Sequence, residues 1–286
     1  MSELLLPFNY DYMVKAIWVS AMVGAVCAFL SAYLMLKGWS LMGDALSHSV
    51  VPGVAGAYAV GLPYAAGAFF SGMLAALAMT FVRQITRLKE DAIIGFIFST
   101  FFAIGLLIIS LNPTSINVQS IIFGNILGIA DEDALQVLVI IVVTFLILCL
   151  RWKDLLAVFF DENHASSLGL SPMRLKILFF TLLSACTVAA LQTVGAILVI
   201  AMVITPGATA YLLTDRFGYL ILISIAVGAL TSAMGAYISF FLDGATGGVI
   251  VTLQTLVFLI AFVFAPKHGV LAARRQRRRA SRGENL

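Results

Sequence analysis

Asp44 and His48 stand four residues apart inside an otherwise apolar stretch, GDALSHSVVPGVAGAYAVG. In a helix this spacing places both side chains on one face, one turn apart. An aspartate oxygen and a histidine nitrogen can then bind one metal ion. A charge at the centre of a membrane-spanning helix costs about 2.5–3.5 kcal/mol, so such a pair calls for a function. The alternative is that the two side chains hydrogen-bond each other and only hold helices together.

Two ligands do not complete a transition-metal site, which takes about four to six. A second copy of the chain, related by a two-fold axis at this helix, would supply another carboxylate and another imidazole. We therefore expect a homodimer in which the Asp44 and His48 side chains of both copies face the axis. Oxygen and imidazole ligands suit Mn, Fe or Zn, whereas Cu(I) prefers sulfur ligands.

The residues that follow this pair predict a helix that is interrupted and closely packed. Pro52 has no N–H for the carbonyl of His48, four residues earlier, so we expect that carbonyl to be free and Pro52 to act as a hinge. Gly53, Ala57 and Gly61 then form a stripe of small residues, which allows another helix to approach closely.

The composition indicates what surrounds these residues. Of 286 residues, 62% are hydrophobic and only 11% are charged, and the mean hydropathy is +1.06. This excludes an ordinary soluble domain, a disordered chain and a DNA-binding protein. Continuous apolar runs of about 20 residues indicate spanning helices rather than barrel strands. We predict an all-α polytopic membrane protein with eight to nine transmembrane helices in a single domain over 1–286.

The nine candidate spans lie near 15–36, 42–61, 64–83, 91–111, 134–150, 174–192, 195–213, 218–241 and 248–265. A re-entrant element over 173–213 would reduce the number to eight. Basic residues gather in alternate connections, as expected for cytoplasmic loops: Lys37, then Arg83, Arg87 and Lys89, then Arg151, Lys153, Arg174 and Lys176, then Arg216.

The orientation follows from these loops. The connections 112–133 and 242–247 contain no Lys or Arg and are expected outside. The N-terminus is then external, although Lys15 opposes this mildly. The basic tail 267–286 predicts a cytoplasmic C-terminus, and nucleic-acid binding by this tail is the weaker interpretation.

Two further segments suggest moving parts. Pro206 and Gly207 lie in the middle of one apolar run, where a missing hydrogen bond permits a bend, so we expect a gating hinge there. The external segment 112–133 mixes Asn, Pro and Gly with short apolar pieces, which is typical of a broken or re-entrant element. This segment ends in three acids, Asp131, Glu132 and Asp133. They either attract cations or a delivery protein, or simply begin a solvated helix. We favour the solvated helix start.

Over nearly its whole length, the chain resembles the permease family of manganese, iron and zinc ABC importers. Three stretches carry the resemblance: DALSHSVVPGVAGAY, FFDENHASSLGLSP and QTVGAILVIAMVITPGATAYLLTDRF. The resemblance is closest to the chelated-iron and manganese permeases of bacteria. It implies an ABC-importer permease-like bundle in the bacterial cytoplasmic (inner) membrane, where Asp44 and His48 contact the transported metal. It also implies a homodimer, two cytoplasmic ATPase subunits and an external metal-binding protein.

The same resemblance gives a role to the cytoplasmic loop 155–172. Such a loop carries a short helix that couples the permease to its ATPase. The residues expected to take part are Asp161, Glu162, Ala165 and Gly169, whereas we interpret His164 as a surface residue.

The sequence also lacks the motifs of an enzyme. It has no GxxxxGK[ST] for binding ATP, and no HExxH or GxSxG. We therefore expect a permease that depends on a separate ATPase and holds no permanent cofactor, its divalent metal (Mn, Fe or Zn) being cargo. The alternatives are a proton-coupled secondary transporter or channel without an ATPase, and an importer of a metal chelate.

Overall fold

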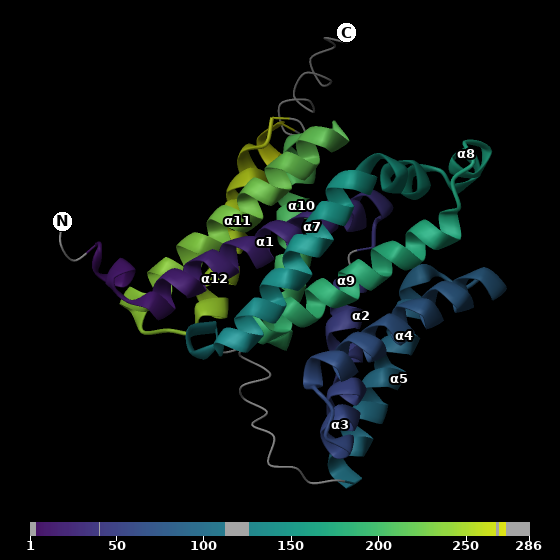
Figure 1. Cartoon of the computed structure of the whole chain (residues 1–286). Coiled ribbons are helices and arrows are strands. Elements are labelled where there is room, and N and C mark those ends of the chain that lie inside the picture. The colour runs from purple at the N-terminus through teal and green to yellow at the C-terminus, as the bar shows by residue number, and fades with distance from the viewer. Residues whose placement is uncertain (1–3, 40, 112–125, 267–268, 273–286) are drawn as a thin grey trace, which may run out of the picture. The chain divides into compact units, whose positions relative to one another are not determined.

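The computed structural model describes residues 4–39, 41–111, 126–266 and 269–272, and these ranges form helices without a β-strand (Figure 1). The predicted all-α fold class is confirmed. The elements are η1 (Leu6–Asn9), α1 (Asp11–Lys37), α2 (Met42–Ser49), α3 (Val51–Val60), α4 (Tyr64–Ile85), α5 (Glu90–Leu111), η2 (Ile126–Gly128), α7 (Asp131–Phe160), α8 (Glu162–Ser167), α9 (Pro172–Val194), α10 (Ala196–Leu213), α11 (Phe217–Leu242) and α12 (Thr246–Phe264).

Among the described residues, seven helices are long and apolar enough to cross a membrane: α1, α4, α5, α7, α9, α11 and α12. A shorter apolar helix, Val199–Leu213, occupies the place of another predicted span. The short helices α2 and α3 together cover the remaining one. Seven long helices and one shorter apolar helix among the described residues come close to the prediction of eight to nine.

The predicted single span 42–61 is wrong in one respect, because it consists of two helices that meet at Val50. Val50, which lies between the two helices, itself keeps helical torsion angles (φ −76°, ψ −19°). Pro52 lies in the first turn of α3, where its missing N–H is tolerated, and this interrupts the hydrogen bonds of a continuous helix. Gly61, with a φ of 72°, ends α3.

Helix α7 runs beyond the predicted span 134–150 and ends at Phe160. Hydropathy falls where Arg151 and Lys153 begin, but good helix formers continue the helix after the apolar run has ended. The predicted tail 267–286 is described only over 269–272, and the predicted outer element 112–133 only from 126 onward.

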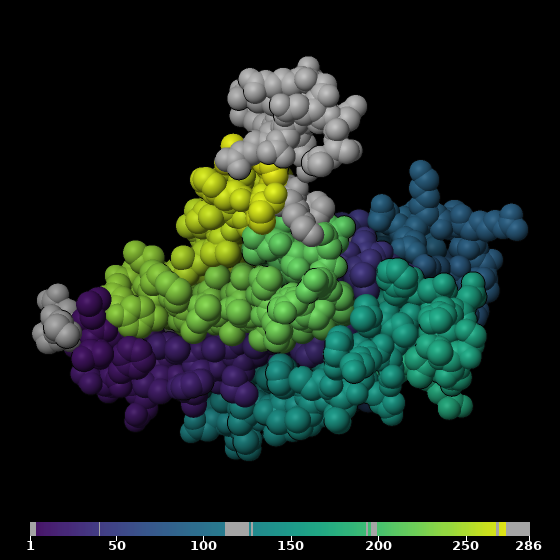
Figure 2. All heavy atoms as spheres, turned by 90° about the horizontal axis from the view of Figure 1, so that it is seen from above, coloured from purple at the N-terminus to yellow at the C-terminus, as the bar shows by residue number. Residues whose placement is uncertain are grey.

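The chain forms two compact units. The first comprises Met1–Met35 and Ala201–Leu286, and contains most of α1 with the second part of α10, α11 and α12. Figure 2 shows α11 lying along the N-terminal helix. A Cβ on Gly24 of α1 would lie 2.5 Å from the Gly228 carbonyl oxygen of α11, and the Ser224 hydroxyl donates to the Ala28 carbonyl at 2.6 Å. Small residues thus let these two backbones approach closely.

The second unit, Leu36–Ile200, contains the helices from α2 to α9. Within it, α3 packs between α4 and α5, and α9 packs on α4 and α7 (Figure 1). The contact of α3 with α4 is tight at Gly53 and Gly67, where a Cβ on either residue would overlap the carbonyl oxygen of the other. The helix that carries Asp44 and His48 therefore continues into a firmly packed segment.

Candidate functional site

Helix α2 brings Asp44 and His48 together as their spacing predicts. The Nε2 atom of His48 lies 3.3 Å from Oδ1 of Asp44. The side chains are 27% and 38% exposed for His48 and Asp44 respectively, so both remain accessible from outside this single chain. The two atoms are close enough to bind one cation between them.

Two aromatic residues on α5 flank the histidine, and sequence reasoning missed them. The ring centroids of Phe98 and Phe102 lie 5.3 and 5.5 Å from that of His48. The Phe102 ring meets the imidazole edge to face, at 75°. Their spacing of four residues on one helix was the only available signal, and such a pair is ordinary in a spanning helix. The imidazole therefore has an aromatic wall on one side and Asp44 beside it.

The backbone around Pro52 differs from the prediction, because the His48 carbonyl is not left free. It accepts the N–H of Val50. The next carbonyl, that of Ser49, accepts the Ser71 hydroxyl of α4 at 2.6 Å. The interruption between α2 and α3 is thus satisfied partly by another helix, which sequence spacing alone does not reveal.

The small-residue stripe is confirmed at two of its three positions. Gly53 faces Gly67 of α4, and Ala57 lies beside the same glycine. Gly61 faces open space and serves as the end of the helix instead. On the other side of α3, a Cβ on Gly105 of α5 would lie 2.9 Å from the Pro52 nitrogen. Helices α4 and α5 therefore enclose the residues that follow the Asp44 and His48 pair.

Within the described part of the chain, no group of three or more His, Cys, Asp or Glu side chains is placed to hold a metal ion. The chain itself thus offers a pair of ligands at α2. The second copy that would complete the set remains a prediction.

The predicted coupling loop forms the short helix α8. The Asp161 carboxylate caps it by accepting the N–H groups of Asn163 and His164 at 2.9 and 3.2 Å. Ala165 is buried, and Gly169 ends the turn with a φ of 80°. His164 is exposed, as predicted.

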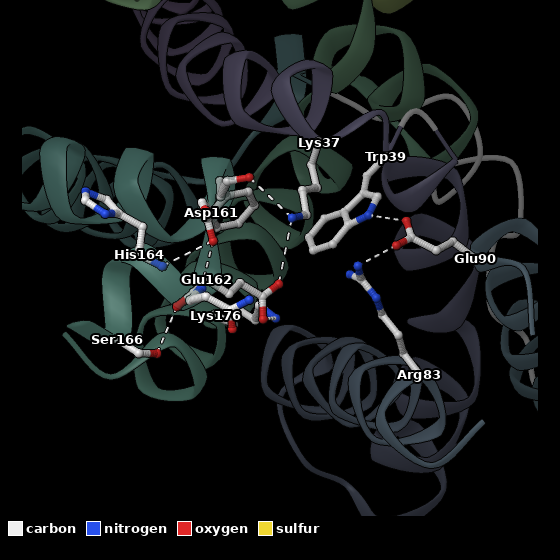
Figure 3. A network of polar contacts seen from close by, with 11 residues as sticks. Lys37, Trp39, Arg83, Glu90, Asp161, Glu162, His164, Ser166 and Lys176 are labelled. Atoms are coloured by element: carbon white, nitrogen blue, oxygen red, sulfur yellow. Dashed lines mark hydrogen bonds and ion pairs between the residues drawn. The ribbon is translucent and has the colours of Figure 1, made fainter. Parts of the chain in front are cut away.

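Glu162 holds α8 against its neighbours through two ion pairs (Figure 3). Its carboxylate lies 2.5 Å from Nζ of Lys176 on α9 and 3.7 Å from Nζ of Lys37 on α1. Burial by itself would raise the pKa of Glu162. The hydrogen bond and charge of Lys176, helped by Lys37 and Arg83, outweigh burial and hold this pKa below its usual value.

The predicted hinge at Pro206 and Gly207 lies inside α10 and is buried. Ser31 of α1 bridges the backbone there: its hydroxyl donates to the Ile204 carbonyl and accepts the Gly207 N–H, each at 3.0 Å. A Cβ on Gly207 would lie 2.6 Å from the Ser31 carbonyl oxygen. A hydroxyl from another helix thus bonds the backbone on both sides of the proline, and a hinge role stays a prediction.

The three acids from Asp131 to Asp133 lie exposed in the first turn of α7. The predicted helix start is confirmed, and acidic side chains are favourable there. The choice between a solvated helix start and a site that attracts cations or a delivery protein stays a prediction. The residues 112–125 of the predicted outer element lie outside the described residues.

Comparison with known proteins identifies this arrangement. The sequence model of the ABC 3 transport family matches residues 9–265. The chain belongs to the ABC 3 transport family. The predicted family is thereby confirmed, and with it a multi-pass membrane permease of a bacterial ABC transporter.

Relatives of this ABC 3 family chain have names that include a metal. This chain is 86% identical over 275 residues to the chelated iron transport system membrane protein YfeC of Yersinia pestis, and the match covers 96% of this chain and 94% of YfeC. It is 49% identical over 269 residues to the manganese transport system membrane protein MntB of Synechocystis sp., covering 93% and 87%. The solved structure of PsaBC from Streptococcus pneumoniae in complex with Fab matches with a TM-score of 0.84 and 35% identity, covering 96% of this chain and 99% of that one.

Proposed function

We propose that this chain is the permease subunit of an ATP-driven importer that moves a divalent first-row metal, Mn or Fe and also Zn, into the bacterial cytoplasm. The observation that carries the proposal is the accessible Asp44 and His48 pair, with 3.3 Å between its nitrogen and oxygen atoms. The names of the relatives, which refer to chelated iron and manganese transport, support the same class of cargo.

The proposed transport path begins with metal from an external binding protein. The ion contacts Asp44 and His48, whose oxygen and imidazole nitrogen suit these metals. A second permease copy supplies the remaining ligands, because no third His, Cys, Asp or Glu joins the pair among the residues that the structure describes. The ion then leaves to the cytoplasm, where the C-terminus lies.

The energy comes from two cytoplasmic ATPase subunits that dock on the loop 155–172. The capped helix α8 is the short separate helix of that loop, between the end of α7 and the start of α9, so we assign the contact to it. Asp161, Ala165 and Gly169 act by shaping this helix: the first begins it, the second anchors it and the third ends it.

The test is Mn²⁺ uptake into proteoliposomes that contain the permease, its ATPase and the binding protein. Asp44→Ala and His48→Ala are each expected to lower uptake by at least about tenfold, since each removes one of few ligands. Both variants should still co-purify with the ATPase. Asp154→Asn is the matched control, because it breaks the exposed ion pair with Arg151 at 2.9 Å.

Uptake at the wild-type rate in either alanine variant would reduce the pair to a structural role. Competition by Fe²⁺ and Zn²⁺ in the same assay ranks the three metals. Uptake that proceeds without the ATPase and ATP would contradict the importer and favour a proton-coupled carrier.

A further inference from the structure

The residues 37–39, which we call the linker, connect α1 to the segment that carries Asp44 and His48. On one side the linker is bonded to the coupling loop. The Lys37 ammonium donates to the Phe159 carbonyl at 3.3 Å and pairs with the Glu162 carboxylate at 3.7 Å. Any displacement of α8 therefore acts on the last residue of α1.

On its other side the linker is bonded to α5 and α4. The Trp39 indole N–H donates to Oε2 of Glu90 at 2.5 Å, and the other Glu90 oxygen pairs with Arg83 at 2.5 Å. The Arg83 guanidinium also lies 5.2 Å from the centre of the Trp39 ring. Only 4% of Trp39 is exposed, so the indole side of this contact is buried, whereas the Glu90 side chain is 38% exposed.

Gly38 makes these two attachments compatible. Its φ of 73° is a conformation that glycine adopts without strain, and a Cβ there would meet nothing within 4 Å. In Figure 3 the Lys37 amine turns toward Glu162 while the Trp39 indole N–H points toward Glu90. The glycine thus lets the side chains of the residues before and after it, Lys37 and Trp39, turn to different helices.

The linker also lines a cavity. A cavity of about 250 Å³ is lined by Trp39, Arg83, Glu90, Glu162 and Lys176, among others. Closely packed protein does not deform gradually, but a side chain beside a void can occupy a second position. The cavity gives Trp39 room to move when its ion-paired neighbours move.

We propose that the linker couples α8 to α2, with Lys37, Trp39 and Glu162 as positioning residues that relate ATP hydrolysis to the state of the Asp44 and His48 pair. Helix α2 begins three residues after Trp39, so a shift of the linker moves the start of that helix. This inference rests on the proposed function, because it assigns the coupling to the same transport cycle.

The experiment measures Mn²⁺ taken up per ATP hydrolysed, in proteoliposomes of the permease with its ATPase and binding protein. Lys37→Met removes the ion pair, and Trp39→Phe keeps an aromatic ring but removes the N–H that reaches Glu90. Each is expected to lower the Mn²⁺ to ATP ratio by roughly tenfold, a usual size for coupling between two sites, while hydrolysis continues. Lys37→Arg keeps the charge and should retain most of the ratio.

A double variant separates coupling from general damage. If both residues act in one connection, Lys37→Met with Trp39→Phe lowers the ratio about as much as either change alone. Asp154→Asn, which breaks an ion pair outside the linker, should leave the ratio unchanged.

A wild-type Mn²⁺ to ATP ratio in both single variants would overturn the proposal, and so would additive losses in the double variant. Loss of ATPase co-purification would also overturn it, because the linker would then serve assembly of the complex. Failure of the importer itself looks different, because the wild-type complex would then take up no Mn²⁺.

Discussion

At the scale of single residues, the candidate site combines one contact that spacing predicts with others that it does not. Asp44 and His48 meet because residues four apart on a helix are always neighbours. Phe98 and Phe102 reach the imidazole from α5, and Ser71 reaches the end of α2 from α4. Those contacts depend on how separate helices pack, which no local pattern contains.

The aromatic wall predicts a measurable role for Phe102. Phe102→Leu removes the edge-to-face ring contact with His48, which is worth about 0.5–1.5 kcal/mol, and leaves the imidazole less well oriented. We expect the KM for Mn²⁺ uptake to rise about two- to tenfold, with a smaller change in kcat. Phe96→Leu is the matched control, because Phe96 lies on the same helix with 67% of it exposed.

An unchanged KM in Phe102→Leu would show that Asp44 and the backbone orient His48 without the ring. A fall in kcat alone would also contradict the assignment, since a loosened ligand first weakens binding of the ion.

At the scale of elements, hydropathy located the long helices, but helix ends depended on other properties. Helix α7 continues past the apolar run because its polar residues still favour a helix. The expected span 42–61 divides at Val50 because a proline follows two residues later. The length of an apolar run shows which residues can lie in the lipid, whereas backbone hydrogen bonding decides where a helix ends.

The contact between α3 and α4 supplies a sharp test of helix packing. Gly53→Ala introduces a methyl group that overlaps the Gly67 carbonyl, so the two helices must separate. We expect a loss of about 1–3 kcal/mol in the free energy of unfolding, measured by denaturation in detergent. Gly56→Ala, on the same helix with nothing within 4 Å of its Cβ, should be neutral or slightly stabilising. Equal stability of the two variants would show that this approach is not tight.

At the scale of the whole molecule, the ion pairs of one carboxylate join three helices. Glu162 connects α8 to Lys37 of α1 and to Lys176 of α9. The sequence relates Lys37 and Lys176 only to the orientation of the chain, because a basic residue near a span end satisfies the positive-inside rule whatever it contacts.

The lowered pKa of Glu162 predicts how stability changes with pH. A carboxyl whose folded-state pKa is below its unfolded value stabilises the fold above the unfolded value, near 4.5, and this contribution is lost as pH falls through the folded-state pKa. Wild type should therefore be more stable than Glu162→Gln at neutral pH. The difference should shrink below about pH 4.5 and vanish at lower pH, as thermal unfolding in detergent at several pH values would show. A difference that stays constant down to the lowest pH would exclude an ionic origin.

The amino-acid sequence by itself determined that this is a helical membrane protein, which family it resembles and which pair of side chains meets on one helical face. The first property follows from composition, the resemblance from three matching stretches of sequence, and the pair from spacing within one segment. None of them requires knowledge of neighbouring helices. Tertiary structure alone decided that Phe102 lies against His48, that Ser31 bridges the backbone at Pro206, and that Lys37 and Trp39 are bonded to different helices. The physical reason is that such contacts join residues far apart in the chain, and they form only when whole helices have packed.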